Sequence, residues 1–181
     1  HLASAGQLED SARAFGRAAR MAEVLGSRAR ARELFDEGID HLRDAEGALG
    51  AVRGQLEIAA GELALRAVEL ADVRDRAKRA LVDLESTRDA AQTVRALRLL
   101  AKGAGSSTSR GPTALLLDSG AGRLAREGHP IDAARVFFEA AGLRLGGHDD
   151  LGAERLLRRA AELVVDQLEE LLTLSCGEPM A

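Results

Sequence analysis

The feature that most constrains this chain is a residue pattern that recurs about every 20 positions. In each copy, a glycine is followed by a smaller residue five or six positions later, a large apolar residue nine positions later, and a small residue twelve or thirteen positions later. Glycine favours the left-handed conformation that ends a helix, and the three later residues share one helix face. The pattern therefore predicts helices of similar length that pair into hairpins of about 40 residues. The copies begin at Gly6, Gly26, Gly47, Gly128 and Gly147, and their large residues are Phe15, Phe35, Leu56, Phe137 and Leu156.

The residue composition favours an all-α fold. Apolar residues make up 46% of the chain, but they are mostly Ala, Leu and Val, with four Phe and no Tyr or Trp. The first proline is Pro112, so the preceding 111 residues contain no residue that forbids a helix. No segment alternates apolar and polar residues over six positions, and we expect no strands. The predicted fold is a stack of antiparallel helical hairpins, an α-solenoid.

A second regularity is a series of large apolar residues at every seventh position. This spacing fits the seam of a long coiled-coil-like helix pair, but it also fits the interior stripe of packed hairpins. Charged residues at the second seam position, including Glu46, Arg53 and Arg74, favour the interior stripe. Three glycines in register predict a turn near residues 47–50 and close helix packing at Gly54 and Gly61. The series runs through Phe35, Leu42, Leu49, Leu56, Leu63 and Leu70.

One stretch has the composition of a linker. Residues 103–112 read GAGSSTSRGP, and they separate a helical hairpin block at 1–102 from a three-helix unit at 113–175. In that unit we expect helices near 113–127, 130–145 and 149–174, followed by a tail at 176–181. Pro130 fits the first turn of the second helix, and Asp149 or Asp150 is placed to cap the third.

The motifs of common enzymes and metal sites are missing from the sequence. No HExxH, paired CxxC or EF-hand loop occurs, and the linker glycines Gly103 and Gly105 lack the strand and the Gly-Lys-Ser/Thr of a phosphate loop. His129 and His148 flank a helix of about 16 residues, which would hold them roughly 24 Å apart. We therefore predict a protein that is not an enzyme and that has no catalytic residues, metal or cofactor.

Charge and cysteine content narrow the partners and the compartment. The net charge is −4 and aromatic stacking residues are scarce, which argues against nucleic-acid binding. The lone Cys176 excludes an intrachain disulfide and indicates a reducing, cytoplasmic compartment. No run of 18 apolar residues occurs, so we expect no transmembrane segment, while peripheral membrane association stays open. Because the chain begins with His1 rather than Met, we expect a fragment or a processed product.

Two basic clusters are the candidate binding residues. Solvated helix faces explain most such runs, but consecutive basic turns also suit an acidic peptide or an anionic membrane surface. The cluster within residues 74–79 also includes Lys78. The cluster within residues 155–159 is followed by the acidic residues Asp166, Glu169 and Glu170. The candidate partner-binding residues are Arg155, Arg158, Arg159, Arg74, Arg76 and Arg79.

Two segments resemble tetratricopeptide-like helical repeats. They read AREGHPIDAARVFFEAAGLRLGGHDDLGAERLLRRAAELV and ASAGQLEDSARAFGRAARMAEVLG. Gly128, Ala133, Phe137 and Ala140 match the repeat's last glycine and second-helix positions, as do Gly6, Phe15 and Ala18, whereas Leu117, Ala121 and Leu124 replace its first-helix aromatics. The segment DAARVFFEAA resembles sequences of the soluble NSF attachment protein branch, whose members bind SNARE bundles and an ATPase. This resemblance implies a role in protein transport. Residues 113–174 also resemble a microtubule-interacting-and-transport domain, which would bind short helical tails.

These observations lead to two functional hypotheses. The first is a non-catalytic adaptor or scaffold that binds a partner helix or peptide, in a groove between hairpins or along the Arg155 to Arg159 face. The alternative is a structural subunit of a larger assembly, which self-associates as a homo-oligomer through the leucine series 35–70.

Overall fold

The computed structural model of this 181-residue chain describes residues 2–87, 89–105 and 107–176, of which 2–4, 107 and 170–176 are described by their backbone only. These residues form eight helices and no strand, which confirms the all-α prediction. The helices are α1 (Leu2–Val24), α2 (Arg28–Asp40), α3 (Gly47–Arg66), α4 (Leu70–Asp83), α5 (Ala90–Gly103), α6 (Ser107–Arg126), α7 (Pro130–Leu145) and α8 (Asp150–Cys176).

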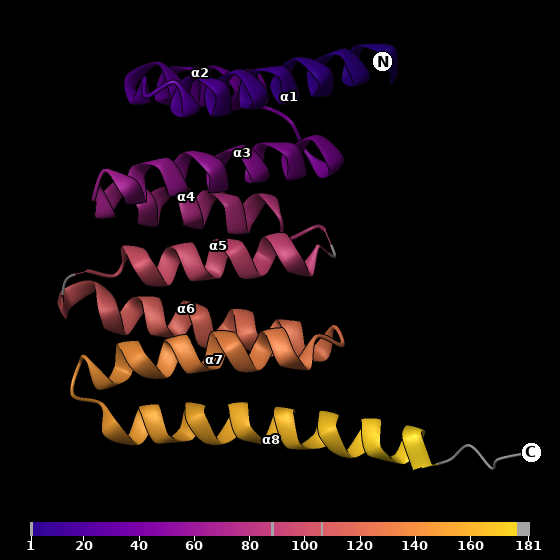
Figure 1. Ribbon diagram of the computed structural model, residues 1–181, viewed down its shortest axis with the longest axis vertical. Coiled ribbons are helices and arrows are strands. Elements are labelled where there is room, and N and C mark those ends of the chain that lie inside the picture. The colour runs from indigo at the N-terminus through magenta and orange to yellow at the C-terminus, as the bar shows by residue number, and fades with distance from the viewer. Residues whose placement is uncertain (1, 88, 106, 177–181) are drawn as a thin grey trace, which may run out of the picture. The chain divides into compact units, whose positions relative to one another are not determined.

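The chain divides into two compact units. Unit 1, His1–Gly103, contains α1 to α5, and unit 2, Ala104–Ala181, contains α6 to α8. In unit 1 the helices pair as α1 with α2, α3 with α4 and α4 with α5, and α3 also contacts α1, α2 and α5 (Figure 1). In unit 2, α7 packs against both α6 and α8 (Figure 1). Each unit is thus built from antiparallel hairpins, as the sequence predicted.

Four of the helix-to-helix turns share one hydrogen-bond pattern. At the turn after α1, the N–H of Ser27 donates to the carbonyl of Ala22 and the N–H of Gly26 to that of Glu23, both at 2.9 Å. These two bonds satisfy carbonyls that the end of a helix leaves free. The turns after α3, α6 and α7 repeat the pattern, and the residues with positive φ at the four turns are Gly26, Val68, Gly128 and His148.

The prediction that these glycines end helices in the left-handed conformation is therefore confirmed at two turns, and the structure differs from it at three positions. Gly26 and Gly128 have the expected positive φ. Gly6 lies within α1, and Gly47 has a positive φ at the first residue of α3 rather than after a helix. At the turn after α7, His148 takes the left-handed conformation although Gly147 precedes it. Helix length decides these positions, because the left-handed residue is the one that falls just beyond the last helical turn.

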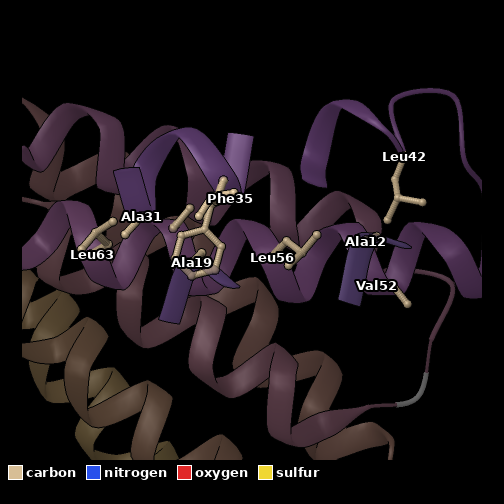
Figure 2. Packing of buried hydrophobic residues seen from close by; sticks show 10 residues of the cluster. Ala12, Ala19, Ala31, Phe35, Leu42, Val52, Leu56 and Leu63 are labelled. Atoms are coloured by element: carbon tan, nitrogen blue, oxygen red, sulfur yellow. The ribbon is translucent and has the colours of Figure 1, made fainter. Parts of the chain in front are cut away.

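The seven-residue series lies inside unit 1. Phe35 of α2 and Leu56 and Leu63 of α3 are buried in one cluster, together with Leu42 from the turn after α2. Figure 2 shows the ring of Phe35 next to Ala19, so a bulky side chain fills the space above a small one. Since the series crosses α2, a turn, α3 and α4, it does not form one continuous helical seam. The interior-stripe interpretation is correct, and the long coiled-coil helix pair is wrong.

Close helix packing occurs at both predicted glycines. A Cβ added to Gly61 would lie 2.6 Å from Cδ2 of Leu99 on α5, and one added to Gly54 would lie 3.1 Å from Cβ of Asp83 on α4. The absence of side chains lets α3 approach both neighbouring helices. The predicted turn at 47–50 is shifted, because α3 already begins at Gly47 and the turn occupies the residues before it.

The predicted linker is shorter than expected. Helix α6 begins at Ser107 and includes Pro112, so residues 107–112 are helical rather than part of a flexible 103–112 segment. Helix α7 has the predicted bounds, and Asp149 caps α8 by accepting a 2.9 Å hydrogen bond from the N–H of Gly152. Helix α8 ends at Cys176, and the rest of the predicted tail, 177–181, lies outside the described residues.

Candidate interaction groove

Unit 1 contains an open groove between its first two hairpins. Helices α2 and α4 both pack on α3, so α2 and α4 form the walls and α3 forms the floor. The wider part of the groove has a volume of about 730 Å³. Its lining consists of Asp36, Ile39, Asp40, Arg43, Arg53, Glu57, Arg76, Lys78, Arg79, Val82 and Asp83.

A buried carboxylate stands at the centre of the floor. Glu57 of α3 accepts hydrogen bonds from two arginines of α4, at 3.2 Å from Nη1 of Arg76 and 2.6 Å from Nε of Arg79. Glu57 and Arg76 are both buried, whereas Arg79 is half exposed at the rim. A buried charge is tolerated only when it is paired, and these bonds supply the pairing.

Arg76 also joins the two walls. Its Nη2 donates to Asp36 of α2 at 2.7 Å, and its Nε donates to Asp72 of α4 at 3.0 Å. Burial by itself lowers the pKa of Arg76, but the hydrogen bonds with Asp36 and Asp72 outweigh it and raise the pKa above its ordinary value. Arg76 therefore stays charged and holds α2 and α4 at a set separation.

A second pair closes one end of the groove. Nε of Arg53 donates to Asp83 at 2.9 Å, and Nη1 of the same arginine donates to the carbonyl of Leu42 at 2.7 Å. The hydrogen bond with Asp83 raises the pKa of Arg53. One guanidinium thus ties the end of α4 to the turn after α2, and this fixes the shape of the groove at that end.

A separate, smaller hollow of about 270 Å³ lies between the same helices, toward the first residues of α2 and α4. Arg32 of α2 bridges it, with Nη1 at 2.7 Å from Glu69 and Nη2 at 3.2 Å from Asp72. The floor here is aliphatic, with Ala60, Leu63 and Ala64 of α3 among its residues. Because α2 and α4 run in the same direction, these contacts form a ladder of charge pairs along the groove.

The chemistry of the lining suits the binding of a polypeptide. Its deep charges are paired with one another, so they shape the groove. The rim carries Arg43, Lys78 and Val82, all exposed. Among the described residues, Lys78 has no ion pair, and Arg43 pairs with its neighbour Asp40 on the surface.

The first predicted basic cluster does not form one face. Arg76 and Arg79 turn toward Glu57, whereas Nη1 of Arg74 donates to the carbonyl of Gly103 at 2.9 Å, at the end of α5. Arg76 is buried and is unavailable to a partner's surface. Of the three arginines predicted to bind a partner here, Arg79 alone reaches the rim of the groove.

The second cluster lies on α8 and is largely occupied by internal contacts. Arg159 donates to Asp118 of α6 at 2.7 Å and stacks 4.3 Å above the ring centroid of Phe137. Arg155 lies 3.6 Å from the same Asp118, and Arg158 pairs with Glu154 one turn earlier on α8. A docking role for these arginines stays a prediction, and Arg158 is the most exposed of them.

The most buried residue of the groove, Glu57, was missed by sequence reasoning. Glu57 follows Leu56 and precedes Ile58 in an apolar part of α3, and a charge in such a position is a signal of a buried pair. Nothing in the sequence names its partners, however, because Arg76 lies 19 residues away on another helix.

Neither a metal site nor a membrane-spanning helix is found among the residues that the structure describes. Within the described part of the chain, no three His, Cys, Asp or Glu residues are grouped so that they could hold a metal ion. None of the helices, over the residues that the structure places, has the length and apolarity needed to cross a membrane.

Comparison with known proteins adds no family to this geometry. No protein-family model matches the chain, and no curated protein matches it. The resemblance to tetratricopeptide-like repeats and to the soluble NSF attachment protein branch therefore stays a prediction.

Proposed function

We propose that this chain is a non-catalytic protein-interaction module that binds a segment of another protein in the groove between α2 and α4. The observation that carries the proposal is an open channel of about 730 Å³ whose deep charges are already paired. Grooves between hairpins are where stacked-helix proteins bind their partners.

The length of the groove limits the size of the bound segment. Helix α4 has 14 residues, which span about 21 Å at 1.5 Å per residue. An extended segment of about seven residues covers that length at roughly 3.3 Å per residue. A short linear stretch of a partner protein is therefore sufficient to fill the groove.

The rim favours an acidic segment with apolar side chains. Among the positively charged residues that line the groove, Lys78 is the one that has no ion pair in the described part of the chain. Ile39 on α2 and Val82 on α4 offer apolar contacts on opposite walls. Carboxylates near Lys78 and Arg43, with a Leu-like side chain between the walls, would complement this surface.

The test uses the full chain and two labelled synthetic peptides of about eight residues. One peptide alternates Glu with Leu, and the other alternates Lys with Leu. We expect the Glu peptide to bind more tightly in fluorescence anisotropy, and to shift the backbone NMR signals of α2 and α4 most. The double variant Arg43→Glu/Lys78→Glu should weaken that binding by roughly fivefold to tenfold, since two exposed charges are reversed.

The matched control is Arg30→Glu/Arg135→Glu, which changes the net charge equally at exposed positions outside the groove lining. It should leave the affinity for the Glu peptide nearly unchanged. Binding that is the same in both double variants, or signal shifts confined to helices other than α2, α3 and α4, would contradict the proposal.

A further inference from the structure

A small hollow lies between α1 and α3, and it shares no lining residue with the groove between α2 and α4. Its volume is about 190 Å³. Together with Gly16, three arginines of α1 line it, and α3 contributes two apolar residues and one amide. These residues are Arg13, Arg17, Arg20, Val52, Leu56 and Gln55.

The missing side chain of Gly16 shapes this hollow. A Cβ added to Gly16 would lie 2.8 Å from Cδ2 of Leu56, so α1 approaches α3 closely at this point. The same Cβ position is 3.9 Å from Nη2 of Arg20 and 4.0 Å from its Nη1. The guanidinium group of Arg20 therefore lies back over Gly16, at the edge of the hollow.

Two of the three arginines have no charged partner. Arg13 is paired with Glu9, whose Oε1 lies 2.9 Å from Nε of the arginine. Arg17 and Arg20 have no hydrogen bond or ion pair among the residues that the structure describes.

Acidic residues near the hollow do not compensate these two charges. Its lining contains no acidic residue. Glu23, which follows Arg20 by three positions, is paired with Arg66, and Asp10 precedes Arg17 by about two helical turns. In the groove, by contrast, the deep arginines are matched by carboxylates. The hollow thus carries two unbalanced positive charges.

The side of the hollow formed by α3 offers one polar group in apolar surroundings. Gln55 is half-buried, and its side-chain amide has no hydrogen bond over the described residues. Such an amide can donate two hydrogen bonds. Val52 and Leu56 beside it are both buried. A ligand in the hollow therefore meets a free donor where water is partly excluded, and this strengthens a hydrogen bond.

These features fit an oxyanion with two negative charges. The planar guanidinium group of arginine binds carboxylate and phosphate oxygens through pairs of N–H donors. A carboxylate would balance one of the two free charges. A phosphate monoester carries about −1.5 to −2 charges at pH 7 and three acceptor oxygens, which is enough for both arginines and Gln55. The charge balance therefore favours a phosphate monoester.

The shape of the site favours a phosphorylated side chain of a protein. Arg13 and Arg20 are seven residues apart, so the row of arginines follows the crevice for about 10 Å. A polypeptide can lie along such a crevice, and the apolar Val52 and Leu56 can contact the carbon atoms between its backbone and the phosphate. A bilayer presents its phosphates in a plane, which meets protruding side chains before it meets a recess between two helices.

We propose that the hollow between α1 and α3 binds a phosphorylated serine or threonine of another protein, with Arg17 and Arg20 on the phosphate and Gln55 as a third donor. This site is separate from the groove between α2 and α4, and it does not depend on the function proposed for that groove.

The first test uses the full chain and labelled peptides of about seven residues. The peptides contain only Ala and Gly apart from the central residue, which is phosphoserine, serine or glutamate. In fluorescence anisotropy, we expect the phosphoserine peptide to bind at least about tenfold more tightly than the other two, because it alone engages both arginines. Its backbone NMR shifts should be largest in α1 and α3. Equal binding of the three peptides, or shifts confined to other helices, would overturn the proposal.

Variants of the lining identify the residues that hold the phosphate. Arg17→Gln/Arg20→Gln should weaken binding of the phosphoserine peptide at least about tenfold. The control Lys102→Gln/Arg126→Gln removes the same charge from two exposed positions outside the hollow, and it should leave the affinity unchanged. Equal losses in the two double variants would contradict the assignment.

A single isosteric change tests the site without disturbing the fold. Gln55→Glu places a carboxylate of the chain itself beside Arg17 and Arg20, so the phosphoserine peptide should bind at least about tenfold more weakly. The melting temperature should be unchanged or higher, which separates lost binding from lost structure. Full binding by this variant would exclude Gln55 and the two arginines as one site.

Two further probes distinguish other sources of phosphate. Inorganic phosphate should displace the phosphoserine peptide only at a much higher concentration, because it lacks the contacts of the peptide stem. Phosphatidylcholine vesicles that contain phosphatidic acid should bind the chain no more tightly in cosedimentation than vesicles without it. Displacement by inorganic phosphate at the concentration of the peptide, or binding that requires phosphatidic acid, would overturn the assignment to a phosphorylated protein.

Discussion

Nη1 of Arg76 lies 3.2 Å from Oε2 of Glu57, and the exposed fractions of the two side chains are only 6% and 3%. Removal of such charges from water is costly, and the cost is offset only when both charges are paired. Arg76 achieves this with Glu57 on the floor of the groove and with Asp36 and Asp72 on its walls. The groove is therefore held by a network whose members depend on one another.

Loss of Glu57 should destabilise unit 1. Glu57→Ala leaves Arg76 without its buried partner, and we expect the free energy of unfolding to fall by about 3 kcal/mol, near the lower end for a broken buried pair, because Asp36 and Asp72 still accept hydrogen bonds. Urea denaturation of the full chain followed by circular dichroism measures the change. Glu33→Ala, in an exposed ion pair with Arg30, is the control and should have little effect. Equal effects of the two variants would show that the buried network contributes no more to stability than an exposed ion pair does.

Replacement by alanine should have opposite effects on stability at a closely packed helical glycine, Gly61, and at one with open space around it, Gly142. A Cβ on Gly61 would lie 2.6 Å from Cδ2 of the buried Leu99, so Gly61→Ala should destabilise the protein by about 1–3 kcal/mol. Gly142 has no atom within 4 Å of the same Cβ position, and Gly142→Ala should stabilise α7 by up to about 1 kcal/mol. Thermal and urea denaturation of both variants check this. Stabilisation by Gly61→Ala would refute the close approach of α3 and α5.

A glycine should be better than valine at the turn after α3. Val68 has a φ of 62°, a conformation that β-branched residues rarely adopt, and its side chain is 73% exposed. Val68→Gly relieves this strain and loses little packing, so we expect a gain of about 0.5–1 kcal/mol after the added chain entropy of glycine. The adjacent Ala67 has a φ of −89°, and Ala67→Gly should destabilise the protein instead. A loss of stability in Val68→Gly would contradict the observed turn.

Acid should weaken the cap of α8. The hydrogen bond from the N–H of Gly152 and the nearby Arg144 hold the pKa of Asp149 below its ordinary value of 3.8. Because the folded pKa is the lower one, the stabilisation is present above about pH 4 and is lost as the pH falls through the folded pKa. Asp149→Asn also caps a helix but does not titrate. In thermal denaturation between pH 6 and pH 2, we expect the wild type to lose stability more steeply than this variant, and parallel curves would contradict the assignment.

The sequence predicted the fold better than it predicted the site. Small and large residues at fixed offsets from each glycine are local information, and the structure buries them as expected at Phe35, Leu56, Phe137 and Leu156. Pro130 and Asp149 likewise marked helix starts correctly, because their effects act within one turn. The linker prediction failed at Pro112, because α6 begins at Ser107 and continues through this proline, although a proline at the sixth helical position removes one backbone hydrogen bond.

The groove depends on contacts between distant parts of the chain. Arg74, Arg76 and Arg79 look alike in the sequence, but one bonds to the end of α5, one is buried on Glu57, and one reaches the rim. Their rotation around α4 and the position of α3 assign these roles.

Local spacing alone thus determined that this protein is made of helices, roughly where they begin and end, and which residues enter the interior. The tertiary structure decided which charges become buried partners, how α2 and α4 are held apart, and which arginines of α1 remain unpaired beside a hollow. The physical reason is the distance along the chain over which each kind of interaction acts. Backbone conformation and helix faces depend on residues within a few turns, whereas burial and ion pairing depend on which helix arrives from elsewhere in the chain.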